Sequence, residues 1–405
     1  MGESVQRRDR AWGLSRMDVA GAFGDVGILL PIAIALISLN HMNPTAVFLL
    51  AGLAYIVAGA YFRIPMAVEP FKAVAAISLA LHLAPSAIAS AGFLMGVLLF
   101  AIGATNVVGP LARLFSLPII RGIQLGLGLI LAREGLRLAL GPGAGLDLGA
   151  RFGMSGRFVL AGWMVALMGA VLLVALRDSR RLPSALVLLG AGLLLGLAAR
   201  SASHPSALNG FSAGPLPLHL LRLNLGECRS VLTVLVLPQF ALTFGNSIVA
   251  TENTARILYG PQARRVTARA LSTSIGLMNL LSGAILAAPT CHGSGGITAH
   301  YKFGARSQKS SYVIGGLCLL LALTGKSCVA LLSLVPMAIL GVFLLYVGLQ
   351  HALFLRDIVA HKRLCVIAVT TGLVSIATTN LTYGFLAGFL VQGLLALVSK
   401  PRSGR

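Results

Sequence analysis

A succession of hydrophobic segments constrains the fold of this chain more than any other feature. Fourteen segments are predicted near residues 24–39, 45–62, 64–82, 88–105, 118–138, 158–176, 184–199, 231–251, 269–288, 289–301, 310–325, 328–350, 363–379 and 380–398. A membrane-spanning helix needs roughly 20 apolar residues, and a broken one can be shorter. Only 11% of the 405 residues are charged, against about 25% in soluble domains. The sequence therefore predicts an all-α polytopic membrane protein.

A polar linker over residues 200–229 divides these segments into two sets of seven. It contains Pro205, Pro215 and Pro217 together with several Ser and Gly residues, which is typical of a loop. Because seven is an odd number, the second set must enter the membrane in the opposite sense from the first. Inverted repeats of this kind are common in secondary transporters. We therefore expect a first repeat over residues 1–205 and a second over residues 206–405.

The basic residues follow the same arrangement. If the N-terminus is cytoplasmic, most of the 32 Lys and Arg residues fall in inside loops, as they do in membrane proteins generally. The distribution places both termini in the cytoplasm, and we expect the membrane to be the cell (inner or plasma) membrane. It also accounts for the net charge of +21, which in a soluble protein would suggest nucleic acid as a partner. Nucleic acid is therefore not expected to bind.

Proline and glycine interrupt the third and the tenth segments, which occupy equivalent positions in the two halves. The third opens with Arg63-Ile-Pro-Met-Ala-Val-Glu-Pro-Phe-Lys72, and the tenth with Pro289-Thr-Cys-His-Gly-Ser-Gly-Gly296. Proline inside a helix removes backbone hydrogen bonds. Each break is therefore expected to be an extended piece followed by a half-helix, which begins near Pro70 in one case and near Ser294 in the other.

Broken backbone at membrane depth is tolerated only where protein buries it or where it lines a cavity. Two half-helices that meet near the midplane would direct their N-termini at one site. Each N-terminus carries unpaired N–H groups and about half a positive charge, so the site favours an anion. Tight packing of kinked helices is the alternative for a single break, but two equivalent breaks favour a binding site.

The residues around these breaks resemble the molybdate transporter family, which is related to sulfate permeases. The resemblance rests on Gly21-Ala-Phe-Gly-Asp-Val-Gly27 with Pro31, on Ile64 to Lys72, on Leu237-Pro-Gln-Phe-Ala-Leu-Thr-Phe-Gly-Asn-Ser247, and on Pro289 to Gly296 with Tyr301-Lys-Phe-Gly-Ala-Arg-Ser307. It implies a seven-plus-seven inverted-repeat fold, in which a core domain (spans 1–4 and 8–11) moves against a gate domain (spans 5–7 and 12–14). It also implies molybdate as the substrate, with sulfate or tungstate close behind. The chain departs from the family pattern at Glu69, where Gln is usual, and at Phe71, where Met is usual.

Candidate substrate-binding residues come from the two breaks and from the eighth segment. Lys72 would neutralise an oxyanion, and the glycines would let the backbone approach it closely. Polar side chains at helical spacing in the eighth segment would offer uncharged donors, or alternatively hold neighbouring helices together. The predicted set is Glu69, Pro70, Phe71, Lys72, Gln239, Thr243, Asn246, His292, Gly293, Ser294, Gly295 and Gly296.

Three ionisable residues are candidates for coupling transport to a proton: Glu69, Asp25 and His292. Ionisable groups within membrane spans are costly and are functional candidates by default. Each also has a structural interpretation. Glu69 would pair with Lys72, Asp25 would cap a helix or pair with a nearby Arg, and His292 would hold local structure.

These features together predict a secondary active transporter of a tetrahedral oxyanion, above all molybdate, that works by alternating access. The alternatives are a sulfate or other anion permease, a nucleobase permease of the same fold, and a channel. Cys291 and His292 are adjacent without an orienting third group, and no metal-ligand spacing is found. No enzymatic activity, metal or cofactor is therefore predicted. The expected partners are the oxyanion, a coupled proton or other ion, and the lipid bilayer, and a homodimer is compatible with this architecture.

Overall fold

The computed structural model describes residues 14–105, 107–108, 116–141, 144–147, 159–176, 179, 184–203, 214–222 and 225–398. Arg7, Arg8, Arg10 and the expected repeat boundary near residue 205 lie outside these ranges. Most of the described residues are helical. The helices of the first half are α1 (Arg16–Leu39), α2 (Pro44–Phe62), α3 (Lys72–Leu81), α4 (Pro85–Thr105), α6 (Leu117–Leu140), α7 (Gly162–Leu176) and α8 (Ser184–Ser203).

The second half begins with one long helical stretch that contains two π-helical segments. It comprises α9 (Leu225–Val231), η3 (Leu232–Val236), α10 (Leu237–Leu242), η4 (Thr243–Ala250), α11 (Thr251–Tyr259) and η5 (Gly260–Arg265). The remaining helices are α12 (Ala268–Ala284), α13 (Ser294–Lys302), α14 (Lys309–Leu323), α15 (Gly325–Leu332), α16 (Met337–Leu353), η6 (Phe354–Ile358), α17 (Lys362–Thr378) and α18 (Leu381–Val398). Two short strand pairs, β1 (Glu69–Pro70) with β4 (Thr290–Cys291) and β2 (Leu146–Asp147) with β3 (Val159–Leu160), complete the described elements.

Local sequence signals set several helix ends. The Ser15 hydroxyl accepts a hydrogen bond from the Asp18 amide at 3.0 Å and caps α1, and Asn43 caps α2 with Pro44 in the first turn. Both residue types are preferred at these positions. Because α1 begins at Arg16, Asp25 lies inside the helix. The interpretation of Asp25 as a helix-start cap is therefore wrong.

Five of the described helical segments are long and apolar enough to cross a bilayer by themselves. The predicted segment over residues 328–350 is not one helix. It begins in α15, which is bent by 94° from α14, and the chain starts a new helix at Met337 after Pro336. Proline ends the preceding turn because it has no N–H to continue the ladder. The predicted count of fourteen spans stays a prediction.

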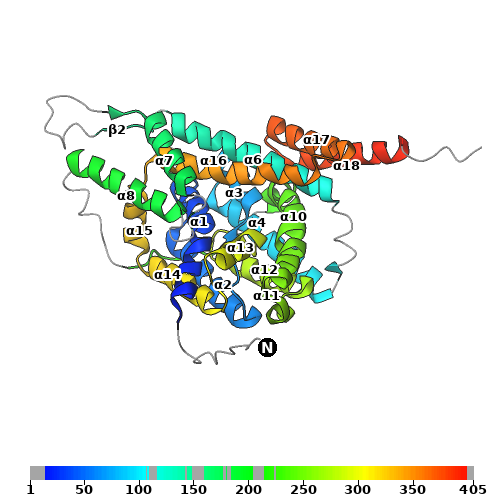
Figure 1. The fold of residues 1–405 in the computed structure, drawn as a ribbon, viewed down its shortest axis with the longest axis horizontal. Coiled ribbons are helices and arrows are strands. Elements are labelled where there is room, and N and C mark those ends of the chain that lie inside the picture. The colour runs from blue at the N-terminus through cyan, green and yellow to red at the C-terminus, as the bar shows by residue number, and fades with distance from the viewer. Residues whose placement is uncertain are drawn as a thin grey trace, which may run out of the picture.

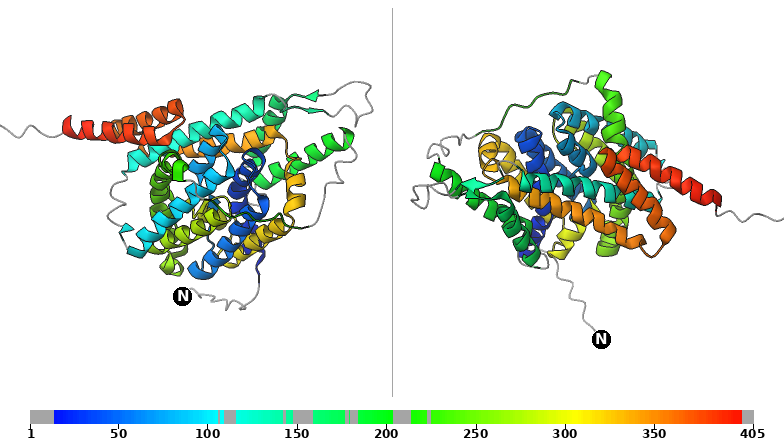
Figure 2. Two further views of the ribbon diagram at one scale, coloured as in Figure 1. Left: turned by 180° about the vertical axis from the view of Figure 1, so that it is seen from behind. Right: turned by 90° about the horizontal axis from the view of Figure 1, so that it is seen from above.

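The helices form two bundles. Helices α6 and α16 lie side by side along the upper edge of Figure 1 with α17 and α18 next to them, whereas α1–α4 and α10–α14 lie below. The view from behind in Figure 2 shows the same separation. Glycines bring α6 and α16 into close contact. A Cβ atom on Gly128 would lie 2.5 Å from the Gly348 carbonyl oxygen, and one on Gly348 would lie 2.5 Å from that of Gly128.

The pairing of helices repeats as an inverted repeat requires. In predicted span numbers, α2 packs on α14 (spans 2 and 11) and α4 packs on α12 (spans 4 and 9). If every span is replaced by its counterpart seven places along the chain, the contact of spans 2 and 11 becomes the contact of spans 9 and 4, and the reverse. The contact between α6 and α16 (spans 5 and 12) maps onto itself. The lower bundle in Figure 1 corresponds to the core domain, and the upper bundle corresponds to the gate domain.

Candidate functional site

The two breaks predicted from the sequence meet in space. Strands β1 and β4 pair antiparallel, with Glu69 opposite Cys291 and Pro70 opposite Thr290. The Phe71 amide then donates to the Pro289 carbonyl at 2.8 Å. Directly after each strand a half-helix begins, α3 at Lys72 and α13 at Ser294. The predicted form, an extended piece followed by a half-helix, is confirmed for both breaks.

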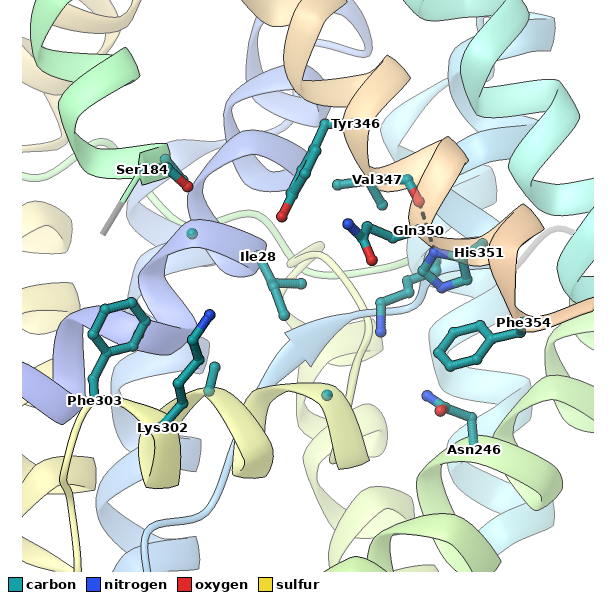
Figure 3. Close-up of a pocket in the computed structure, with 16 residues that line it drawn as sticks. Ile28, Ser184, Asn246, Lys302, Phe303, Tyr346, Val347, Gln350, His351 and Phe354 are labelled. Carbon is teal, nitrogen blue, oxygen red and sulfur yellow. Dashed lines mark hydrogen bonds between the residues drawn. The ribbon is translucent and has the colours of Figure 1, made fainter. Parts of the chain in front are cut away.

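A cavity of about 290 Å³ lies beside this crossing, between the two bundles. Figure 3 shows the residues that line it. The core bundle contributes Gly24, Gly27, Ile28, Lys72, Asn246, Gly295, Ala299, Lys302 and Phe303. The gate bundle contributes Ser184, Ala185, Tyr346, Val347, Gln350, His351 and Phe354. Within the described part of the chain, no acidic side chain lines the cavity, so the charged groups facing it are cationic.

Of the predicted substrate-binding residues, Lys72, Asn246 and Gly295 line this cavity. Asn246 belongs to the π-helical segment η4, where the Thr251 hydroxyl donates to its carbonyl at 3.0 Å. Such π turns are frequent at functional sites. The Asn246 side chain accepts from the Ser294 hydroxyl at 3.2 Å, at the start of α13. The other predicted residues do not line the cavity: they are Glu69, Pro70, Phe71, Gln239, Thr243, His292, Gly293, Ser294 and Gly296.

Lys72 and Glu69 form a buried ion pair. Glu69 is fully buried and Lys72 is 6% exposed. The pair proposed as a structural alternative is therefore present, although Glu69 belongs to strand β1 and not to the helix. Since the two charges offset each other, the pair adds little net charge to the cavity.

The side chain of Gln239, a residue of α10, caps the start of α3. Its side-chain oxygen accepts from the amides of Ala73 at 2.9 Å and Val74 at 3.4 Å, and its nitrogen donates to the Thr243 hydroxyl at 3.0 Å. These two amides are therefore already bonded within the protein. Both half-helices were expected to direct unpaired N–H groups at one ligand. For α3 this expectation is wrong, because Gln239 from the eighth segment caps the helix.

His292 lies behind the cavity wall with both ring nitrogens engaged. Nδ1 is 2.8 Å from the Ala67 carbonyl and Nε2 is 2.9 Å from the Ser274 hydroxyl. The ring also packs edge-on against Phe62. These contacts match the structural interpretation of His292. Neither ring nitrogen is directed at the cavity, because both are bonded to other parts of the core: the chain just before β1 and helix α12.

Asp25 and Glu69 approach each other around Gly296. The Tyr55 hydroxyl donates to Asp25, and His300 Nε2 lies 3.7 Å from Asp25 Oδ2. Among the described residues, the partners of Asp25 come from α2 and α13, and none of them is the expected Arg. Asp25 Oδ1 and Glu69 Oε1 are buried without a hydrogen-bond partner among the described residues. A Cβ atom on Gly296 would contact both carboxylates, at 2.6 Å from Glu69 Oε1.

None of the gate residues that line the cavity was predicted from the sequence. Tyr346, Gln350 and Phe354 recur at a spacing of four, which places them on one face of a helix. Nothing in a nearly uniform apolar segment marks that face as the one toward the core. The charge distribution assigns Lys302 to an inside loop, whereas the structure places it at the end of α13. Its spacing from Gly295 and Ala299 is the signal that could have placed it on the cavity face of α13.

The sequence model of the family described as "Molybdate transporter of MFS superfamily" matches residues 17–131 and 232–350. The chain is 29% identical over 430 residues to "Molybdate transporter 2" of Arabidopsis thaliana, covering 97% of this chain and 90% of that protein. It is 28% identical over 487 residues to "Molybdate transporter 1" of Chlamydomonas reinhardtii, covering 95% of this chain and 92% of that protein.

Among solved structures, the transmembrane domain of the cyanobacterial bicarbonate transporter BicA is similar with a TM-score of 0.64 and 17% identity, covering 92% of this chain and 96% of that one. Murine Slc26a9 in the inward-facing state is similar with a TM-score of 0.68 and 18% identity, covering 96% and 69%. These likenesses show that the chain has the same inverted-repeat fold as these transporters, and with its long apolar helices it is an integral membrane protein. Since the family model matches more than half of the sequence, the chain belongs to the molybdate transporter family.

Proposed function

We propose that the chain is a secondary active transporter that carries molybdate, or a closely related tetrahedral oxyanion, across the membrane by alternating access. The observation that carries this proposal is the cavity between the core and gate bundles, where the two broken segments cross. Its volume of about 290 Å³ is at the lower end of ligand pockets, which suits a small solute. The names of the curated relatives support molybdate as the first choice.

The lining of the cavity supports an anion. Lys72 and Lys302 face it, and the start of α13 adds the partial positive charge of a helix N-terminus. Tyr346, Gln350 and Asn246 offer uncharged polar groups. Such groups select an oxyanion by geometry, because they bond its oxygens without adding charge. We propose that the anion leaves chemically unchanged, and thus that the protein is not an enzyme.

The contacts between the bundles support an inward-facing conformation. With the N-terminus inside, the end of α3 and the end of α6 lie on the outer side. There His82 Nε2 is 3.3 Å from Arg137, and the Thr382 hydroxyl of α18 donates to the Thr233 carbonyl of η3. The cavity instead reaches Phe303, near the inner end of the core. We propose that breaking the outer contacts and closing the inner cavity completes the transport cycle.

We propose that a proton is the coupled ion and that Asp25 and Glu69 hold it. The support is geometric: two buried carboxylates approach Gly296, each with an oxygen that lacks a partner. A proton shared there would supply the missing hydrogen bond and remove a negative charge. The ionisable groups that interact with Asp25 or Glu69 are Tyr55, Lys72, Cys291, His292, His300 and Cys318.

Three features of the organisation remain proposals. These are the repeats over residues 1–205 and 206–405, the cytoplasmic location of both termini in the cell membrane, and a homodimeric assembly. Large apolar side chains such as Tyr383 and Phe389 are exposed on α18, which suits either lipid or a second copy. The mass of the particle in detergent tests the assembly, and labelling of cysteines introduced near each terminus tests the orientation.

Uptake into liposomes tests the proposed function. Purified protein should accumulate molybdate, and tungstate and sulfate should compete for uptake. A pH-sensitive dye in the lumen should report acidification during uptake, and both Asp25→Asn and Glu69→Gln should abolish it. Absence of molybdate uptake with transport of uracil or bicarbonate would refute the substrate. Molybdate uptake without proton movement would refute only the coupling.

A further inference from the structure

His300 is a fully buried histidine of α13 that does not line the cavity. It stands four residues after Gly296, so the two share one face of the helix. The residues of α13 that line the cavity lie on another face: Gly295, Ala299 and Lys302. The ring of His300 instead contacts α1. It therefore lies behind the cavity wall, beside Asp25.

The ring of His300 spans one turn of α1. Its Nδ1 is 2.8 Å from the Gly21 carbonyl oxygen, and its Nε2 is 3.7 Å from Asp25 Oδ2. The Ser310 hydroxyl of α14 lies 3.0 Å from Nδ1 as well. Because a carbonyl oxygen can only accept, Nδ1 carries a hydrogen and donates it. In a neutral ring, Nε2 is then a lone pair that faces a carboxylate oxygen.

The surroundings of His300 differ from those of His292. Both ring nitrogens of His292 have partners, at 2.8 and 2.9 Å. Nε2 of His300 is buried without a hydrogen-bond partner among the described residues. A lone pair and a carboxylate that face each other away from water would repel, and both would lack the hydrogen bonds that water supplies. One proton on either group removes this cost, because one group then donates to the other. The contact between His300 and Asp25 therefore favours a bound proton.

Asp25 connects this contact to the second buried carboxylate. Its Oδ1 approaches Gly296, where Glu69 Oε1 also lies. Its Oδ2 accepts from the Tyr55 hydroxyl and faces His300. A proton can therefore reach Asp25 at one oxygen and leave it from the other.

We propose that His300 is the residue that exchanges the coupled proton with Asp25. In this step the N–H bond at Nε2 breaks, its electron pair stays on the nitrogen, and the proton binds to Asp25 Oδ2. The imidazolium becomes a neutral ring and the carboxylate becomes an acid, while Nδ1 keeps its hydrogen on the Gly21 carbonyl. The two groups need to approach by about 1 Å to reach hydrogen-bond distance. The reverse step unloads Asp25. This inference rests on the proposed proton coupling.

Other ionisable groups lie on the elements around His300. Those already named around Asp25 are joined by Asp18 on α1, Tyr259 on α11, Tyr301 and Lys302 on α13, and Arg306 and Lys309 after it. Within the described part of the chain, Asp25 is the only carboxylate in ion-pair contact with a nitrogen of His300. Glu69 is paired with Lys72. Asp25 is therefore the acceptor for the proton of His300.

A purely structural role for His300 makes a different prediction. Nδ1 joins α13 to α1 through Gly21, and an asparagine amide can take over this bond because its nitrogen is equivalent in position to Nδ1. A structural histidine would therefore tolerate His300→Asn. A histidine that transfers a proton would not, since an amide carries no exchangeable charge. His300→Gln instead directs its amide toward Asp25 and gives up the bond to Gly21.

The experiment measures two kinds of molybdate uptake into liposomes by the wild-type protein, His300→Asn, His300→Gln and His361→Asn. Counterflow into vesicles preloaded with unlabelled molybdate needs no net proton transfer, whereas accumulation driven by an inward proton gradient does. His361 is exposed at the start of α17 and is the matched control. In both His300 variants, accumulation and acidification of the lumen should fall about tenfold or more, whereas counterflow should stay within about threefold of wild type. His361→Asn should stay within about twofold of wild type in both assays.

The two assays separate the inference from the proposals on which it rests. Accumulation at the wild-type level in the His300 variants would overturn the inference, and so would an equal loss of counterflow and accumulation, which indicates a structural residue. If one of the two variants does not fold, the other decides the question. Counterflow without proton-driven accumulation by the wild-type protein would overturn the proposed coupling. Absence of both by the wild-type protein would overturn the proposed function itself.

Discussion

Gly296 is the position where one added methyl group tests the crossing of the two half-helices most directly. An alanine Cβ there would lie 2.5 Å from Ala67 Cβ and 2.6 Å from Glu69 Oε1, and it would also contact Asp25 Oδ1. Real Cβ atoms do not approach other atoms that closely, so the neighbours must move. Overpacking of this kind costs about 1–3 kcal/mol.

The size of the loss depends on how Glu69 relaxes. If the carboxylate moves together with Lys72, the cost for Gly296→Ala stays at about 1–3 kcal/mol. If the buried pair breaks, the cost rises to about 3–5 kcal/mol, because a charge is left without its partner. In either case β1 is displaced from the start of α13, and molybdate uptake should fall about tenfold or more, because the two carboxylates that we propose to hold the coupled proton separate.

Thermal unfolding in detergent and uptake in liposomes measure the two effects. The matched controls are Gly295→Ala, whose Cβ enters the open cavity, and Gly316→Ala on α14, whose Cβ would meet nothing within 4 Å. Both controls should unfold within about 0.5 kcal/mol of wild type. Gly295→Ala should raise the KM moderately by narrowing the cavity. Wild-type stability and uptake in Gly296→Ala would refute the packing argument.

Three further predictions concern other contacts of the site. Glu69→Gln leaves Lys72 buried without its counter-charge and should lower the free energy of unfolding by about 3–5 kcal/mol. In thermal unfolding, the double variant with Lys72→Met should regain most of this stability, but it should not regain uptake. A double variant as unstable as Glu69→Gln would contradict this reasoning. Gln239→Leu removes the acceptor for the first amides of α3 and should lower stability by about 1–2 kcal/mol; an unchanged unfolding temperature would show that those amides find other partners. His82→Cys with Arg137→Cys, joined by a reducible cross-linker, should stop uptake by holding the outer side closed, and reduction should restore it. Full uptake by the cross-linked protein would exclude these residues from the outer gate.

The fold was predictable because its main signals are local in the sequence. Apolar segment length reflects the thickness of the bilayer, and proline and glycine interrupt helices wherever they occur. The crossing of residues 69–70 with residues 290–291 follows from these rules once the two halves are recognised as equivalent. The exception is Pro336, which divides a segment that hydropathy alone presents as one helix.

The site was predictable only on the core side, and there only in part. Lys72, Asn246 and Gly295 reach the cavity as expected. Gln239 turns to the start of α3. His292 is held by backbone and side-chain partners behind the wall. Helical spacing places side chains on a common face but does not say which neighbour that face meets.

By itself, the sequence determined the membrane-embedded helices, the inverted halves and the two broken segments, because hydrophobicity and backbone chemistry act on neighbouring residues. The tertiary structure decided which polar groups remain available to a ligand. Gln239 caps one half-helix, Glu69 offsets Lys72, and α16 brings Gln350 to the cavity. Each of these depends on the relative placement of packed segments or side chains, and the energetic cost of an unpaired buried group selects the arrangement in which most polar groups are paired.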